Sequence, residues 1–154
     1  MQRRAWVGTV LAAVLVAGAA AAAASVVAQQ ITVTMREFSY TPDRIIVPVG
    51  KPVAITLINK GKLPHEFMIY NRPKSMDAMM GHAWVEQTNY FHGVPAAVVG
   101  GKVRRHKGDF LELKVPAGTS ATITFTPVKK GTFEYACMIE DHYEAGQKGV
   151  LVVR

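Results

Sequence analysis

From residue 31 onward, apolar and polar positions alternate in short runs separated by turn residues. Residues 31–35, 45–49 and 53–59 each carry this alternation, which is typical of half-buried β-strands. Pro48 favours an edge position for the second of these strands, because proline cannot donate a ladder hydrogen bond. The alternation over residues 31–59 therefore predicts an all-β domain.

Similar short runs continue to the end of the chain, at residues 67–69, 110–115, 120–126, 133–137 and 150–153. Proline and glycine mark the turns between them. Short strands at this spacing predict a β-sandwich or barrel of seven or so strands.

An insert at about residues 71–108 interrupts this rhythm. Within it, five apolar residues recur with the spacing of one helix face: Met76, Met79, Met80, Ala83 and Trp84. Ser75 is available as the N-cap. We expect one short helix here, followed by a loop at residues 93–101.

The first 28 residues differ from the rest, because Arg3 and Arg4 precede an alanine-rich apolar run that ends in small residues. This is the outline of a secretory signal peptide. The run is also long enough to remain as an uncleaved membrane anchor. We therefore expect residues 29–154 to form one domain outside the cytoplasm, periplasmic or otherwise exported.

Charge changes the picture little. Without Arg3 and Arg4, 16 of the 18 basic residues remain against 11 acidic ones, a formal charge of +5. Nucleic acid is excluded as a partner outside the cell. A basic cluster at residues 102–107 predicts a solvated loop, with a docking patch for an acidic partner or an anionic membrane as the alternative.

The chemistry centres on the single cysteine, Cys137, which ends a predicted buried strand and is followed five residues later by His142. A lone cysteine cannot form an internal disulfide, so it is a free thiol or a ligand. A thiolate and an imidazole on one loop suit a borderline or soft transition metal. Two histidines, one cysteine and a weak axial ligand make the blue-copper set.

The second histidine of such a set is predicted to be His65. It follows the loop at residues 60–64, directly after a strand, about 70 residues before Cys137. Loops at one end of an antiparallel sandwich converge in space. His65 is therefore the natural third ligand.

The chain resembles the cupredoxins, the small blue-copper electron-transfer domains. The similarity rests on Leu63-Pro64-His65-Glu66-Phe67, on the run from Gly131 to Cys137, and on His142 with Gly146-Gln147-Lys148-Gly149-Val150. It implies a Greek-key β-sandwich that holds one Cu(I)/Cu(II) ion through His65, Cys137 and His142. The axial position, usually methionine, carries Gln147, as in the stellacyanin-like members. An amide oxygen favours Cu(II) and lowers the reduction potential.

The resemblance also implies a function. We expect a monomeric electron carrier, not an enzyme, that exchanges single electrons with redox proteins. His142 is expected at the exposed edge through which electrons pass, with Tyr143 in the docking surface. The backbone N–H of Glu66 is expected near the cysteine sulfur, with its side chain solvated or close to the ligands.

One rival function stays open. Met76, Met79, Met80 and His82, with His92 and His106 nearby, provide ligands for a second, softer Cu(I) site. Such a site would make the protein an extracytoplasmic copper carrier or homeostasis protein. A zinc enzyme is disfavoured because no acid/base constellation accompanies the candidate ligands. A binuclear copper centre would need a second cysteine.

Overall fold

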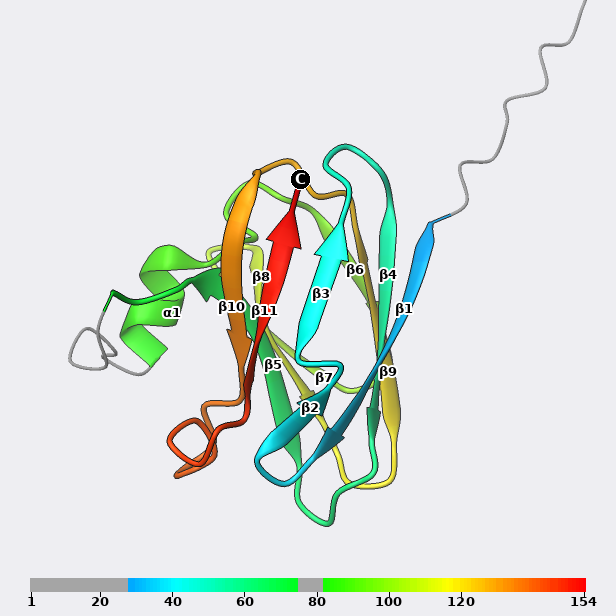
Figure 1. The fold of residues 1–154 in the computed structure, drawn as a ribbon, viewed down its shortest axis with the longest axis vertical. Helices are drawn as coiled ribbons and strands as arrows, with labels where there is room; N and C mark the ends of the chain where they lie inside the picture. The colour runs from blue at the N-terminus through cyan, green and yellow to red at the C-terminus, as the bar shows by residue number, and fades with distance from the viewer. Residues whose placement is uncertain (1–27, 75–81) are drawn as a thin grey trace, which may run out of the picture.

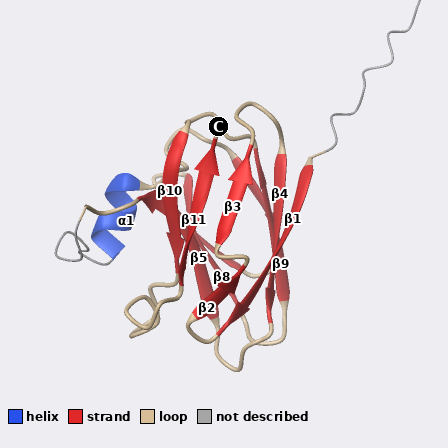
Figure 2. Ribbon diagram, viewed as in Figure 1, coloured by secondary structure: helices blue, strands red, loops and turns tan. Residues whose placement is uncertain are grey.

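Two β-sheets pack face to face across a hydrophobic core in a computed structural model, which describes residues 28–74 and 82–154 (Figure 1, Figure 2). In spatial order, the five-stranded sheet consists of β2 (Ser39–Thr41), β1 (Gln29–Arg36), β4 (Val53–Asn59), β9 (Ser120–Phe125) and β6 (Ala96–Val99). The six-stranded sheet consists of β3 (Arg44–Val47), β11 (Lys148–Val153), β10 (Gly131–Ala136), β5 (His65–Asn71), β8 (Asp109–Val115) and β7 (Lys102–His106). The predicted all-β sandwich is confirmed.

The alternating positions face the core, as the pattern predicts. Val33 and Met35 of β1 and Tyr135 of β10 are fully buried, while Thr34 between the first two is only half-buried. Each large apolar side chain buried in this way stabilises the fold by about 1.5–3 kcal/mol. The two sheets are thus held together by the positions that the alternation marks.

The pairing of the strands explains the edge proline. β1 and β4 pair in parallel, as do β3 and β11, while the other named pairs are antiparallel. β3 lies at one edge of the six-stranded sheet, and Pro48 follows it directly. The edge position predicted for this strand is confirmed.

Two predicted loops are strands. Residues 93–101 contain β6, which pairs with β9, and the basic cluster contains β7, which pairs with β8 across a bulge between Arg104 and Arg105. Both are edge strands in which at least half of the side chains are exposed and the others are half-buried. Their sequences therefore lack the alternation of a buried face. Their strand conformation comes from the neighbouring ladder, and this raises the number of strands to eleven in the described residues.

The single helix of the described residues is α1 (His82–Thr88), which packs beside β5 (Figure 1). Its buried residue is Val85, and Trp84 packs partly buried against the same small apolar cluster. Met76, Met79, Met80 and the expected N-cap Ser75 lie outside the described residues, as does nearly all of the predicted signal peptide, residues 1–28. In the described ranges, the helix is too short to cross a membrane.

Candidate metal centre

The candidate ligands gather at one end of the six-stranded sheet. His65 is the first residue of β5, and Cys137 directly follows Ala136, the last residue of β10. β5 and β10 are antiparallel neighbours, so the beginning of one lies beside the end of the other. His142 comes from the loop between β10 and β11. Sheet topology therefore brings together residues that lie more than 70 positions apart.

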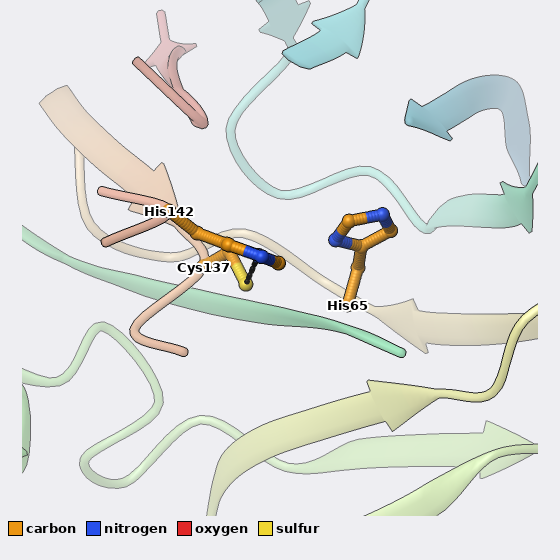
Figure 3. A group of neighbouring side chains, drawn as sticks. All are labelled: His65, Cys137 and His142. Atoms are coloured by element: carbon orange, nitrogen blue, oxygen red, sulfur yellow. Dashed lines mark hydrogen bonds between the residues drawn. The ribbon is translucent and has the colours of Figure 1, made fainter. Parts of the chain in front are cut away.

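The side chains of His65, Cys137 and His142 point toward one another (Figure 3). One ligand atom of each lies within 4.8 Å of the others, and all three residues are at most 3% exposed. The Cys137 Sγ is 3.4 Å from the His142 Nδ1, and the two imidazole centroids are 5.1 Å apart. One nitrogen of the His65 ring faces the other two side chains, and the second nitrogen points away (Figure 3).

Backbone hydrogen bonds give the loop between Cys137 and Gln147 its shape. The N–H groups of His142 and Gln147 donate to the carbonyls of Ile139 and His142, at 3.0 and 2.9 Å. At its ends, the Cys137 N–H donates to the Gln147 carbonyl at 3.1 Å, which closes the loop. Asp141 and Gly146 both have positive φ, which lets the chain turn tightly. The closed loop fixes Cys137, His142 and Gln147 relative to one another.

The electrostatics of the thiol are those of a buried group. Burial raises the pKa of Cys137 to about 11, because the thiolate loses its hydration. The N–H groups of Glu66 and Ile139 act in the opposite direction, and the Glu66 N–H lies 3.3 Å from the sulfur. The expected contact of this N–H with the sulfur is therefore present. A metal ion would supply the positive charge that the thiolate lacks.

Several buried polar atoms have no hydrogen-bond partner, and most belong to the candidate ligands. Both ring nitrogens of His65 and both amide atoms of Gln147 are in this state, although each residue is fully buried. Burial and the neighbouring His142 lower the pKa of His65, which favours the neutral ring that can bind a metal. An unpaired buried polar group costs about 1–3 kcal/mol, so this set fits a site that is completed by an ion.

Gln147 lies beside His65. Its backbone N–H donates to the His142 carbonyl, and its carbonyl accepts from the Cys137 N–H. Its amide is buried against the three-residue cluster rather than at the surface. The side chain is thus available to the position that the sequence assigns to it.

Known proteins resemble this chain in sequence and in structure. The profile of the Cupredoxin-like domain family matches residues 8–85. The Copper-resistant cuproprotein CopI of Pseudomonas aeruginosa is 31% identical over 141 residues, which cover 82% of this chain and 77% of that protein. The chain belongs to the cupredoxin-like domain family.

Two further comparisons agree with this assignment. CopI of Rubrivivax gelatinosus is 32% identical over 123 residues, which cover 79% of this cupredoxin and 61% of that protein. Reduced auracyanin from Roseiflexus castenholzii has the same fold, with a TM-score of 0.60, 22% identity, and coverage of 82% of this chain and 98% of that one. The family profile includes His65 but ends before Cys137, so the roles of the C-terminal loop rest on its geometry.

Two expectations about the surroundings of the site are wrong, and a third, which left two alternatives open, is resolved. His142 is 3% exposed and not an open edge, because the Phe38 ring packs edge-on against it with the centroids 5.5 Å apart. Tyr143 is buried and donates its hydroxyl to Glu134, so it offers no docking surface. Of the two alternatives for the Glu66 side chain, the structure shows the one close to the ligands, since it is 5% exposed, pairs with Lys114 at 2.8 Å and its charge acts on the Cys137 thiol.

In the described residues, His92 and His106 of the proposed second site both contact Glu86 and line one pocket, but they do not form with His82 a group close enough to share an ion. His92 contacts the Asp109 carboxylate and the Glu86 carbonyl, at 3.1 and 2.8 Å, while His82 lies 3.2 Å from the Arg104 guanidinium. Over residues 28–74 and 82–154, His65, Cys137 and His142 form the one group of three or more histidine, cysteine, aspartate or glutamate residues that lie close enough to share an ion. The methionines of that hypothesis lie outside these ranges.

Two residues around the ligands escaped prediction from the sequence. Glu37 lies 3.9 Å from the His65 Nε2, and Phe38 covers His142. Both lie in the turn between β1 and β2, more than 25 residues before the first ligand. No local pattern marks them, because their roles depend on the contact between two loops that only the fold brings together.

Proposed function

We propose that this cupredoxin binds one copper ion through His65, Cys137 and His142, with Gln147 at the axial position, and carries single electrons between redox proteins. The observation that supports it is the convergence of two imidazoles and one thiol, all buried, within 4.8 Å. This donor set matches copper electron-transfer sites. Copper supplies the one-electron Cu(I)/Cu(II) couple when it is bound.

The protein's own residues would hold the ligands still during electron transfer. The loop that carries Cys137 and His142 is closed by backbone hydrogen bonds, and His65 begins a central strand. The Glu66 N–H donates to the sulfur and stabilises its negative charge. The amide oxygen of Gln147, a harder donor than a thioether, favours the oxidised ion. Rigid ligands keep the rearrangement between oxidation states small.

Titration of the purified protein with Cu(II) tests the site. We expect an intense thiolate-to-copper absorption band that saturates at one equivalent, with the EPR spectrum of a type 1 centre. The Cys137→Ser variant should lose the band, whereas the matched control Glu144→Gln, an exposed position of the same loop, should keep it. Absence of the band in the unmodified protein would overturn the proposal.

Copper handling is the second candidate function, and the names of the two CopI relatives favour it. Under this alternative, the protein would bind copper for resistance or delivery, with help from Met76, Met79 and Met80. The stoichiometry separates the two functions. One copper per chain supports electron transfer, while a second equivalent that is lost when these methionines are replaced by leucine supports a carrier.

The setting of either function is proposed from the sequence. We place the protein outside the cytoplasm, with residues 1–28 as a signal peptide or an anchor, and we propose that it acts as a monomer on protein partners and not on nucleic acid. Fractionation of cells that express the full chain, followed by mass determination, tests the export and the cleavage after Ala28. Retention of the intact chain in the membrane fraction would support the anchor.

A further inference from the structure

The turn between β1 and β2 contacts both histidines of the site through two consecutive residues. Glu37 approaches the His65 ring, and Phe38 packs on the His142 ring. The turn comes from the five-stranded sheet, whereas the ligands belong to the six-stranded one. The turn therefore contacts the site from the opposite sheet.

The Glu37 carboxylate is fixed by the loop that delivers His65. Its Oε1 accepts hydrogen bonds from the backbone N–H groups of Lys62 and Leu63, the second at 3.1 Å. The same oxygen lies 3.9 Å from the His65 Nε2. One carboxylate oxygen thus accepts hydrogen bonds from the loop backbone and lies near the His65 Nε2 without a hydrogen bond to it, while the other ring nitrogen faces Cys137 and His142 (Figure 3).

Gly61 shows how closely these groups are packed. A Cβ atom at this position would lie 2.6 Å from the Glu37 Oε1 and 2.8 Å from the His65 Nε2. Such contacts are too short for any side chain. The absence of a side chain at Gly61 therefore leaves the space that the carboxylate and the imidazole share.

Phe38, unlike Gly61, has an unfavourable backbone conformation. It has a φ of 63°, in the left-handed region that is unusual for an aromatic residue, and its side chain is 47% exposed. A strained and exposed ring gains little for the core, yet it covers His142, which is 3% exposed. Strain of this kind persists where the surrounding structure holds it in place.

We propose that Glu37 and Phe38 are positioning residues that set the two imidazoles before any metal binds. The negative charge of Glu37, 3.9 Å from the His65 Nε2, favours the proton on that nitrogen and so leaves Nδ1 free as the ligand atom, and Phe38 shields His142 from water. An outer carboxylate that orients a ligating histidine is a common device in metal sites. The inference rests on the proposed function only in naming these histidines as ligands.

The decisive experiment uses the metal-free protein and imidazole ¹⁵N NMR. We expect His65 in one tautomer, protonated on Nε2. Glu37→Ala and Glu37→Gln, which both remove the carboxylate charge, should give a mixture of tautomers. The control Glu144→Gln should match the unmodified protein. A His65 spectrum in Glu37→Ala that equals the control would overturn the role of Glu37.

Phe38 is tested in the same experiment. Phe38→Gly relieves the left-handed backbone, so folding is not expected to suffer, and the cover over His142 is lost. We expect exchange of the His142 ring N–H with water to accelerate by about tenfold, as for a newly opened site, and Phe38→Tyr to keep the slow rate. Equal rates in Phe38→Gly and in the unmodified protein would overturn the shielding role.

Copper binding is then measured on the same variants, which separates this inference from the proposed function. With copper, Glu37→Ala and Glu37→Gln should broaden the type 1 EPR signal relative to the control Glu144→Gln. If the unmodified protein gives no thiolate-to-copper band, the copper function fails. The metal-free tautomer and exchange data still decide whether the turn positions the histidines.

Discussion

At the scale of single residues, Gln147 is the proposed axial donor, which would bias the oxidation state of a bound copper ion. Its amide is fully buried and has no hydrogen-bond partner in the protein, which is an unusual state for a glutamine. A role as the axial ligand would explain it. The position therefore allows the axial donor to be exchanged while the three other ligands stay in place.

We predict that Gln147→Met raises the reduction potential of the copper protein. A thioether is a weaker and softer donor than an amide oxygen, so Cu(I) gains relative to Cu(II). A tenfold gain corresponds to about 60 mV for one electron, and we expect a shift of at least about this size in a spectroelectrochemical titration. Gln147→Leu, which offers no donor, is the comparison. If both variants keep the original potential, Gln147 is not a ligand.

A second residue-scale prediction concerns the thiol of Cys137 in the metal-free protein. Burial raises its pKa from 9.0 to about 11, so the folded state prefers the neutral thiol. This contribution is fully present below pH 9 and is lost as the pH rises from 9 toward 11. Two pK units correspond to about 3 kcal/mol at most.

Urea unfolding at pH 7, 9 and 11 measures this loss. Lysines and tyrosines titrate in the same range, so the comparison is with Cys137→Ala, which should lose less stability over that interval. The difference between the two proteins isolates the thiol. An identical pH dependence of the two proteins would mean that burial does not raise the pKa of the Cys137 thiol.

At the scale of elements, the ligand loop is tied to the sheet through a buried carboxylate. Glu134 of β10 is 4% exposed and accepts hydrogen bonds from the hydroxyls of Tyr70 and Tyr143, at 2.8 and 3.0 Å. Arg72 lies 3.8 Å from its other oxygen. Because Tyr143 follows His142 directly, this network fixes the loop that carries two ligands.

We predict that Tyr143→Phe loosens the loop and lowers the free energy of unfolding by about 1.5–3 kcal/mol, the usual cost of one lost hydrogen bond to a carboxylate. Amide hydrogen exchange should accelerate at residues 138–146, while β1 and β4 keep their protection. Tyr90→Phe is the control, since its hydroxyl makes two long contacts of 3.4 Å, to the backbone carbonyl and from the backbone N–H of Lys129. Loosening of both sheets alike would contradict a local role.

The same scale shows what the sequence could predict. Alternation marked the buried strands, and the positions of His65 and Cys137 at strand ends followed from it. β6 and β7 could not be found in this way, because an edge strand with both faces partly solvated takes its conformation from its neighbour. Glu37 and Phe38 escaped for a related reason, since their contacts join the two sheets.

At the scale of the whole molecule, the site links separate parts of the chain. His65 begins β5, and Cys137 and His142 follow β10. The surrounding residues include the β1–β2 turn of the other sheet. An ion bound here contacts groups that unfolding would separate, so its binding free energy adds to the stability of the fold.

We therefore predict that copper stabilises the whole domain. A ligand at a free concentration of 1,000 times its Kd adds about 4 kcal/mol when it binds only the folded state, which corresponds to roughly 10 °C in Tm for a chain of this size. Calorimetry with and without one equivalent of Cu(II) measures the shift, and Cys137→Ala and added Ca²⁺ serve as controls. A shift of the same size in Cys137→Ala would place the stabilising copper elsewhere. No shift in the unmodified protein would mean that copper does not bind the folded domain tightly, because an ion held by residues more than 70 positions apart in the sequence must resist their separation.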